Sequence, residues 1–307
     1  MDRQEGQSME WYSFALISAL FSATAAISEK KALFKEGALP FSTLLSIFNL
    51  FLSIPFFLRI DFSTLSALPL AVLLFKSILG ALAFLCVMSG IKNLELSGAL
   101  PLLVLTPGIV AFIAFILLNE ALSFYEISGM ALLLTGTYIL QISTMASLTK
   151  RPQKGIFEPF KVFYRSKGHR YIIGALLLFT VTSILDKALL GRFKTSINVM
   201  MGFQHLFLAI VFFAFFSIST KSPIAIRKTL KQSGRIIFVI ALLTIVYRYS
   251  HFLAVKAGPI ALVLSIKRTS IFFATVIGGK IFHESYLMRK AISTAMMVGG
   301  AILIILF

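Results

Sequence analysis

Apolar residues fill ten long segments of this chain, and short polar stretches separate them. A helix needs about 20 residues to cross the hydrocarbon core of a bilayer, and most of the segments approach that length. Glycine, proline, asparagine and charged residues mark their ends. The segments lie at about 11–28, 40–58, 69–90, 97–118, 124–143, 172–190, 198–218, 235–254, 259–281 and 289–306. This pattern predicts an all-α integral membrane protein with ten transmembrane helices.

The second half of the chain repeats the pattern of the first. The matching positions pair Thr24 with Thr180, Lys31 with Lys187, Asn49 with His205, Lys92 with Lys256, Glu120 with Glu284 and Gly136 with Gly300. Five helices per repeat is an odd number, so the second repeat must enter the membrane from the opposite side. Such inverted repeats are the construction used for alternating access. We therefore predict a first five-helix repeat over 11–143, a basic linker over 144–171 and a second repeat over 172–306.

Composition agrees with a membrane protein. Hydrophobic residues make up 58% of the chain and charged residues 13%, and the mean hydropathy is +0.92. Soluble proteins contain about 25% charged residues. The net charge of +17 is typical of basic loops on anionic lipid, and we expect no nucleic-acid partner because no soluble domain is predicted. Cys86 is the only cysteine, which excludes internal disulfides and thiolate metal sites.

The basic residues also predict an orientation. Loops on one side of the predicted membrane hold most of the Lys and Arg side chains, including the linker 144–171. The positive-inside rule places these loops in the cytoplasm and both termini outside. The first segment follows the acidic stretch 1–10 and lacks a basic n-region, so we interpret it as a retained helix rather than a signal peptide.

The segment 259–281 contains Lys267 and Arg268 side by side near its middle. A charge at the centre of a bilayer costs about 2.5–3.5 kcal/mol on insertion scales. Such a pair is tolerated only where it faces protein, water or an anion. The pair therefore predicts a binding site.

Further polar residues in the apolar segments are candidates for the same site. Segment 235–254 carries Thr244, Arg248 and His251 on one helix face. We predict a basic cavity built mainly from the third, sixth, seventh, eighth and ninth segments. The predicted substrate-binding residues are Lys267, Arg268, Arg248, His251, His205, Gln204, Lys76 and Lys187.

Structural explanations compete with binding for several of these residues. Lys76 and Lys187 lie near helix ends and could extend to the membrane surface. His205 and His251 could form hydrogen bonds between helices, and Asp186 could pair with the adjacent Lys187. Glu120 and Glu284 lie at segment ends, and a capping box from Ser123 to Glu126 is expected to open the next helix. Pro107 is expected to bend the fourth segment.

The sequence contains no signature of an enzyme. It has no Walker A loop, no HExxH motif and no pair of carboxylates near the middle of the membrane. We expect no catalytic residues, no bound metal and no cofactor. Without a nucleotide-binding domain, any transport would be driven by gradients or by exchange.

Ten segments in two repeats, with Glu120 and Glu284 at the ends of the fourth and ninth, resemble the drug/metabolite transporter superfamily of EamA type. The sequence Ile266-Lys267-Arg268-Thr269 is similar to the Lys-Arg pair of the plastid sugar-phosphate translocators. This resemblance implies that Lys267 and Arg268 bind an anion, with arginine suited to a bidentate contact. It also implies that both termini lie in the cytoplasm, opposite to the charge count.

Our leading hypothesis is a secondary transporter or exchanger of a small anionic metabolite, an organophosphate or a carboxylate, in the cytoplasmic membrane. One alternative is an exporter of amino acids or amphipathic compounds, with the basic pair neutralised internally. Another is a lipid-interacting membrane protein with no solute pathway. We expect anionic lipid headgroups at the basic loops, and a monomer or homodimer.

Overall fold

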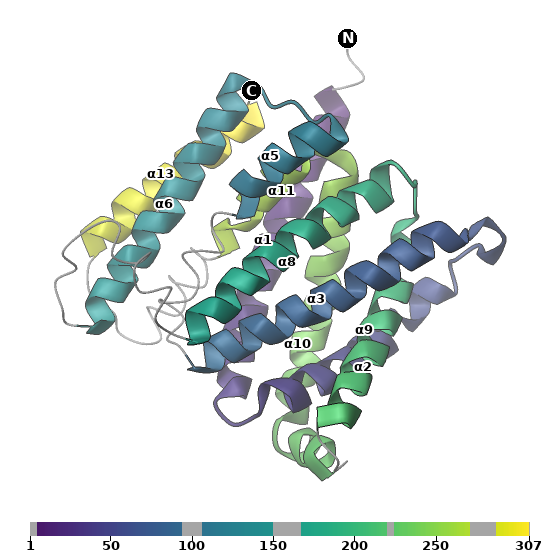
Figure 1. Ribbon diagram of the computed structural model, residues 1–307. Coiled ribbons are helices and arrows are strands. Elements are labelled where there is room, and N and C mark those ends of the chain that lie inside the picture. The colour runs from purple at the N-terminus through teal and green to yellow at the C-terminus, as the bar shows by residue number, and fades with distance from the viewer. Residues whose placement is uncertain (1–4, 94–105, 150–166, 220–223, 271–286, 307) are drawn as a thin grey trace.

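The computed structural model of the chain describes residues 5–93, 106–149, 167–219, 224–270 and 287–306. These residues form α-helices joined by short turns and one 3-10 turn, η1 (Phe62–Thr64) (Figure 1). The helices of the first half are α1 (Glu5–Leu33), α2 (Ala38–Phe57), α3 (Ala67–Asn93), α5 (Thr106–Leu118) and α6 (Phe124–Thr149). Those of the second half are α8 (Lys167–Gly191), α9 (Ile197–Ser219), α10 (Ile224–Ala257), α11 (Ile260–Lys267) and α13 (Leu287–Leu306).

Six helices of the described chain are long and apolar enough to cross a membrane. They are α1, α2, α3, α8, α9 and α10. Large apolar side chains on several helices point away from the protein; Phe51, Phe112, Phe213 and Ile218 are all more than half exposed. Apolar side chains exposed in this way are more stable in contact with lipid tails than in contact with water. The prediction of an all-helical membrane protein is confirmed.

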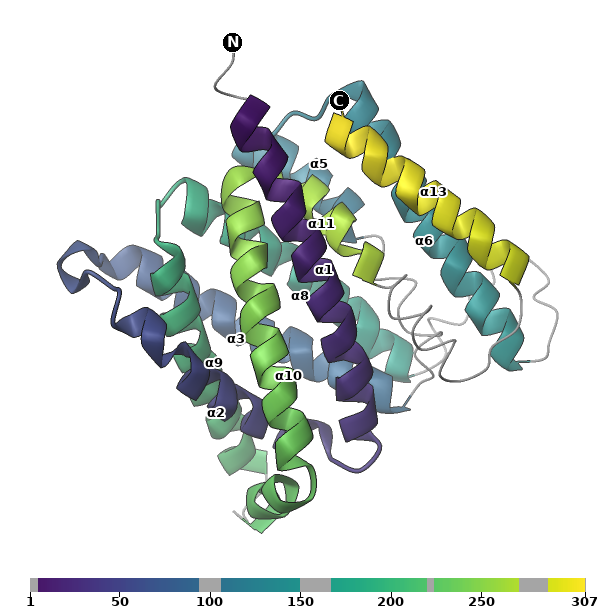
Figure 2. The ribbon, with the colours of Figure 1, turned by 180° about the vertical axis from the view of Figure 1, so that it is seen from behind.

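Helices of the first half pack mainly on helices of the second half. The most extensive contacts join α1 to α10, α3 to α8, α2 to α9 and α6 to α13, and α5 contacts α11. Figures 1 and 2 show α6 and α13 side by side along one edge of the molecule. If α1, α2, α3, α5 and α6 are exchanged in that order with α8, α9, α10, α11 and α13, the α1–α10 contact becomes the α8–α3 contact and the reverse. The pairings of α2 with α9, α5 with α11 and α6 with α13 are unchanged. The start of α1 and the end of α13 lie at the same end of the molecule (Figure 2).

Helices α6 and α13 approach closely because glycines lie at their crossing. A Cβ atom on Gly300 would lie 2.5 Å from the carbonyl oxygen of Gly129, and one on Gly136 would lie 2.8 Å from that of Ser293. Residue numbers rise along one helix as they fall along the other, so the two run antiparallel. Small residues that let backbones approach are a usual means of helix association in membranes.

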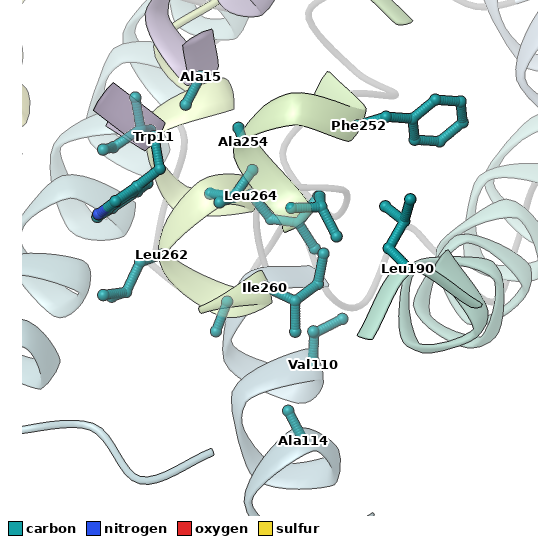
Figure 3. Close-up of a cluster of buried hydrophobic side chains, with 14 of the residues drawn as sticks. Trp11, Ala15, Val110, Ala114, Leu190, Phe252, Ala254, Ile260, Leu262 and Leu264 are labelled. Carbon is teal, nitrogen blue, oxygen red and sulfur yellow. The ribbon is translucent and has the colours of Figure 1, made fainter. Parts of the chain in front are cut away.

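Helix α11 is enclosed by protein on every side. All residues from Ile260 to Ile266 are buried. Figure 3 shows the side chains of α11 among Val110 and Ala114 of α5, Leu190 of α8, and Trp11 of α1. A helix that is apolar all round is stable only in such surroundings. Its position places Lys267, its last residue, and Arg268, which follows it, inside the helix assembly.

The observed helices extend some of the predicted segments. Helix α10 begins at Ile224, whereas the prediction placed a loop before 235. The early part of α10 contains Lys, Arg, Gln and Leu, which favour helix although hydropathy does not mark them. The ends of the predicted linker are likewise helical, since α6 continues to Thr149 and α8 begins at Lys167. The predicted positions 97–105 and 271–281, and Glu284, lie outside the described residues. Pro107 is the second residue of the described part of its helix, so the predicted bend also involves undescribed residues.

Candidate functional site

Four basic side chains from three helices meet inside the protein. Lys76 comes from α3, Arg248 from α10, and Lys267 and Arg268 from the end of α11. Lys267 is within electrostatic reach of the other three, and His251 is within reach of Lys76, Arg248 and Lys267. The structure therefore brings together residues that lie up to 192 positions apart in the sequence. We call Lys76, Arg248, Lys267 and Arg268 the cationic cluster.

Lys76 is fully engaged by its neighbours. Its ammonium group forms a buried ion pair with Asp186 of α8 and donates a hydrogen bond to Gln204 Oε1 of α9 at 2.5 Å. It also lies 5.1 Å from the centroid of the Phe252 ring. The expectation that Asp186 pairs with Lys187 is wrong, because adjacent residues on a helix point in different directions and Asp186 faces α3 instead.

Lys267 and Arg268 have no ion pair within the described part of the chain. The ammonium group of Lys267 lies 5.2 Å from the centroid of the Tyr247 ring, at cation–π distance. Both side chains are half-buried. Arg248 Nε is buried and has no hydrogen-bond partner among the described residues. The described carboxylate within reach of Arg248 is Glu29 of α1, which is itself buried.

A small polar cavity lies beside the cationic cluster, between α2, α3, α9 and α10. It offers about 40 Å³ to a water-sized molecule. Its polar lining comprises Ser42, Ser46, Asn49, His205, Thr244, Tyr247 and Arg248. Asn49 Oδ1 and His205 Nε2 are buried here without hydrogen-bond partners in the described chain.

Lys187 lies at the junction of α10 and α11 and is neutralised there. Its ammonium group pairs with Glu120 Oε1 at 3.0 Å and donates to the carbonyl oxygens of Gly258 at 2.6 Å and Val255 at 3.1 Å. Glu120 Oε2 in turn accepts a hydrogen bond from the backbone N–H of Ile260 at 3.0 Å. These contacts satisfy the end of one helix and the start of the next, so we leave Lys187 out of the candidate site.

The capping box predicted before the fifth segment is confirmed. The backbone N–H of Ser123 donates to Glu126 Oε2 at 2.7 Å, and the backbone N–H of Glu126 donates to Ser123 Oγ at 3.2 Å. This reciprocal pair fixes the start of α6. Glu120, three residues before Ser123, is not part of this capping box; it accepts the backbone hydrogen bond of Ile260 at the start of α11.

Of the predicted residues, Lys76, Gln204, His205, Arg248, His251, Lys267 and Arg268 lie at or beside the cluster and cavity. Sequence reasoning did not select Asn49 or Tyr247 for the site. For Asn49 a signal existed, since it is the counterpart of His205 in the other half of the chain. For Tyr247 there was none, because an aromatic residue in an apolar segment is normally part of the packing.

Comparisons with known proteins agree with this architecture. Residues 9–142 match the model of the EamA-like transporter family. A solved protein crystal structure matches with a TM-score of 0.71 at 16% sequence identity, over 96% of this chain and 97% of the other. At that identity the match establishes the fold alone. A search of the curated proteins finds no match to the chain.

The helices and the family match together define an integral membrane protein. Its residues 9–142 resemble the EamA-like transporter family. The likeness in fold to the solved structure extends over both halves.

Proposed function

We propose that the protein is a secondary transporter or exchanger of a small anionic metabolite, an organophosphate or a carboxylate. The EamA-like match over 9–142 supports a membrane transporter. The substrate class rests on the cationic cluster inside the helix assembly.

The observation that carries the proposal is an excess of positive charge in a buried place. Four basic side chains meet there, against two described carboxylates, Asp186 and Glu29. Buried charges are costly unless they are paired. An anionic substrate would supply the missing negative charge. A phosphate monoester carries about −1.5 to −2 charges at neutral pH, which matches an excess of two better than a single carboxylate does.

Alternating access between inverted repeats fits the helix arrangement. Repeats over 11–143 and 172–306 would exchange α1, α2, α3, α5 and α6 with α8, α9, α10, α11 and α13, and the main helix pairings are retained under that exchange. A cavity of about 40 Å³ holds a few water molecules. A metabolite therefore enters only when helices of the two halves separate.

Exchange is favoured over uniport by the same charges. Reorientation of an empty site would carry unpaired cations through a low-dielectric region, at high electrostatic cost. A bound anion removes most of that cost. Movement between the two states should then require a substrate in each direction.

Thermal unfolding of the purified protein with a panel of ligands tests the proposal. The panel contains sugar phosphates, nucleotides, di- and tricarboxylates, neutral amino acids and organic cations. The variants are Lys267→Ala/Arg268→Ala and, with the same change in charge at exposed positions of α10, the control Lys228→Ala/Lys231→Ala. A ligand at 100 times its Kd stabilises the folded state by about 2.7 kcal/mol.

We expect anions to stabilise the wild type and the control but not Lys267→Ala/Arg268→Ala. Counterflow of the stabilising anion in proteoliposomes then measures exchange. If amino acids or cations stabilise all three proteins alike while anions have no effect, the cluster is structural and an exporter is the better assignment. If no solute binds, a lipid-interacting protein without a solute pathway becomes the better assignment.

A further inference from the structure

Most of the polar residues that line the cavity beside the cationic cluster can accept hydrogen bonds there, while Arg248, Tyr247 and the amide nitrogen of Asn49 are its possible donors. We propose that the cavity is a subsite for the hydroxyl groups of the transported anion, so that the substrate is a hydroxylated anion. This inference rests on the proposed function and narrows its substrate class. It assigns binding roles to Asn49 and His205 that the charge of the site does not require.

The hydroxyl groups of the lining donate elsewhere. Ser42 Oγ donates to the carbonyl oxygen of Ala38 at 2.8 Å, Ser46 Oγ to that of Thr43 at 2.8 Å, and Thr244 Oγ1 to that of Ile240 at 2.7 Å. A hydroxyl has one hydrogen to donate and two lone pairs. With the hydrogen used within its own helix, each of these groups presents only acceptor capacity to the cavity.

A backbone carbonyl group determines which ring nitrogen of His205 is a hydrogen-bond acceptor. Its Nδ1 lies 2.7 Å from the carbonyl oxygen of Met201, and a carbonyl can only accept. The ring hydrogen of the neutral imidazole is therefore on Nδ1, and Nε2 carries a lone pair. His205 is 1% exposed, and its Nε2 has no partner in the described chain.

Asn49 of α2 supplies a second buried acceptor to the cavity that His205 of α9 lines. Its Oδ1 is buried without a partner in the described chain, and the residue is 6% exposed. A buried acceptor without a donor loses its hydration and gains nothing in return. Two such acceptors, on α2 and α9, line one cavity. Groups of this kind are satisfied by a ligand that donates hydrogen bonds.

The neighbouring charges select among donors. Arg248 lines the cavity, Lys76 is within electrostatic reach of His205, and the Lys267 ammonium group lies 5.2 Å from the ring centroid of Tyr247. A ligand ammonium group would be repelled by these cations, whereas a neutral hydroxyl would not. The cavity volume of about 40 Å³ suits two or three groups of the size of a water molecule. It therefore fits part of a ligand whose charged end lies at the cationic cluster.

Two phosphates of equal charge provide the test. Glycerol 3-phosphate and propyl phosphate share a three-carbon chain and a phosphate group and differ by two hydroxyls. Their Kd values are measured by calorimetry on the detergent-purified full-length protein. The variants are Asn49→Leu, which removes the acceptor at similar size, and His205→Gln, which can retain an acceptor. Ser53→Ala is the control, because Ser53 is a buried hydroxyl of α2 that donates to Leu50 and does not line the cavity.

We expect the wild type to bind glycerol 3-phosphate about tenfold more tightly than propyl phosphate. Asn49→Leu should reduce that ratio to about two without weakening the binding of propyl phosphate. His205→Gln should retain most of the ratio, and Ser53→Ala all of it. Because Asn49 Oδ1 has no partner in the part of the chain that the structure describes, the unliganded Asn49→Leu protein should unfold at or above the wild-type temperature.

The outcomes separate this inference from the function on which it rests. If the wild type binds both phosphates equally, the subsite is overturned while the anion site stands, and ordered water is then sufficient to fill the cavity. If neither phosphate binds, nor any other anion of the panel, both proposals fail together. A loss of stability in unliganded Asn49→Leu would assign Asn49 to the packing of α2 and overturn its binding role.

Discussion

Glu120 and Lys187 form an ion pair that joins the two halves of the chain, with Lys187 Nζ 3.0 Å from Glu120 Oε1. Glu120 also accepts the backbone hydrogen bond of Ile260 at the start of α11, and Lys187 binds the carbonyl oxygen of Gly258 just before it. Four helices, α5, α8, α10 and α11, are thus tied at one turn. The only tryptophan of the chain, Trp11, packs on the same turn: a Cβ on Gly258 would lie 2.6 Å from its ring.

Replacement of Lys187 by Met should therefore destabilise the α10–α11 turn. It leaves the Glu120 carboxylate half-buried without its cation and two carbonyl oxygens without a donor, which costs about 1–3 kcal/mol. We expect a lower temperature of unfolding and a shift in Trp11 fluorescence as the turn loosens. Arg192→Met, an exposed change of the same charge just after α8, should leave both measurements unchanged. An unaltered fluorescence spectrum in Lys187→Met would show that the ion pair does not hold the turn.

The buried pair of Lys76 and Asp186 should respond unequally to loss of either partner. Asp186→Asn removes the carboxylate that is paired with Lys76 and lies within electrostatic reach of Lys267. The two ammonium groups then repel each other without that compensation. Lys76→Met leaves Asp186 within reach of Lys267. Breaking a buried pair typically costs about 3–5 kcal/mol. We expect that magnitude for Asp186→Asn and less for Lys76→Met.

Chemical or thermal unfolding of the two single variants and of Lys76→Met/Asp186→Leu measures this difference. The double variant should be more stable than Asp186→Asn alone, because it removes both charges. Equal losses in the two single variants would mean that Lys267 does not compensate for Lys76. The pair would then act as an isolated structural contact.

The helix positions could be predicted because they depend on local patterns, and the members of the cationic cluster could be selected because each is a charge within an apolar stretch. Apolar stretches of bilayer length indicate helices, and adjacent charges within one of them, such as Lys267 and Arg268, indicate a site. The pairing of Asp186 with Lys76 could not be predicted. It depends on α8 packing against α3, and sequence adjacency favoured Lys187 instead. The early part of α10 was missed because its polar residues carry no hydropathy signal although they favour helix.

The sequence also could not predict that most polar residues of the cavity can accept hydrogen bonds there. Ser42, Ser46 and Thr244 become acceptors only because their hydrogens are used by backbone carbonyls of their own helices. Asn49 could be related to His205 through the repeat, but nothing in the sequence places their free atoms in one cavity. Hydrogen-bond direction is a property of the folded helix, not of residue type alone.

The crossing of α6 and α13 should depend on Gly300 and not on its neighbour. A Cβ on Gly300 would lie 2.5 Å from Gly129 O and 2.6 Å from Leu133 N, both backbone atoms that cannot move aside. A Cβ on Gly299 would lie 3.5 Å from a Leu132 methyl group, an ordinary contact. Gly300→Ala should therefore destabilise by about 1–3 kcal/mol through overpacking. Gly299→Ala should be neutral or slightly stabilising through helix propensity.

Thermal unfolding of the two alanine variants, side by side in one detergent, checks this prediction. Because the two glycines are adjacent on α13, differences in helix propensity and expression cancel. Equal unfolding temperatures would mean that α13 can shift away from α6 at little cost. The close contact would then not be needed for the pairing of these helices.

Gly80 offers a way to fill the polar cavity without disturbing the fold. It lies within α3 and lines the cavity, and a Cβ atom there would meet no described residue within 4 Å. Gly80→Ala should stabilise the protein by about 0.5–1 kcal/mol, because glycine is unfavourable inside a helix. Gly80→Leu adds a side chain larger than the space of about 40 Å³, so it should block binding and exchange of the anion while the helices remain folded.

Circular dichroism, thermal unfolding and counterflow in proteoliposomes separate these effects for Gly80→Ala and Gly80→Leu. Helical content should be unchanged in both variants, and only the leucine variant should lose exchange. Gly174 of α8 does not line the cavity, and a Cβ added to it would likewise meet no atom of the described chain within 4 Å, so Gly174→Leu supplies the control. Full exchange by Gly80→Leu would place the substrate path away from this cavity, since a side chain of that size leaves no room for substrate hydroxyls beside Asn49 and His205.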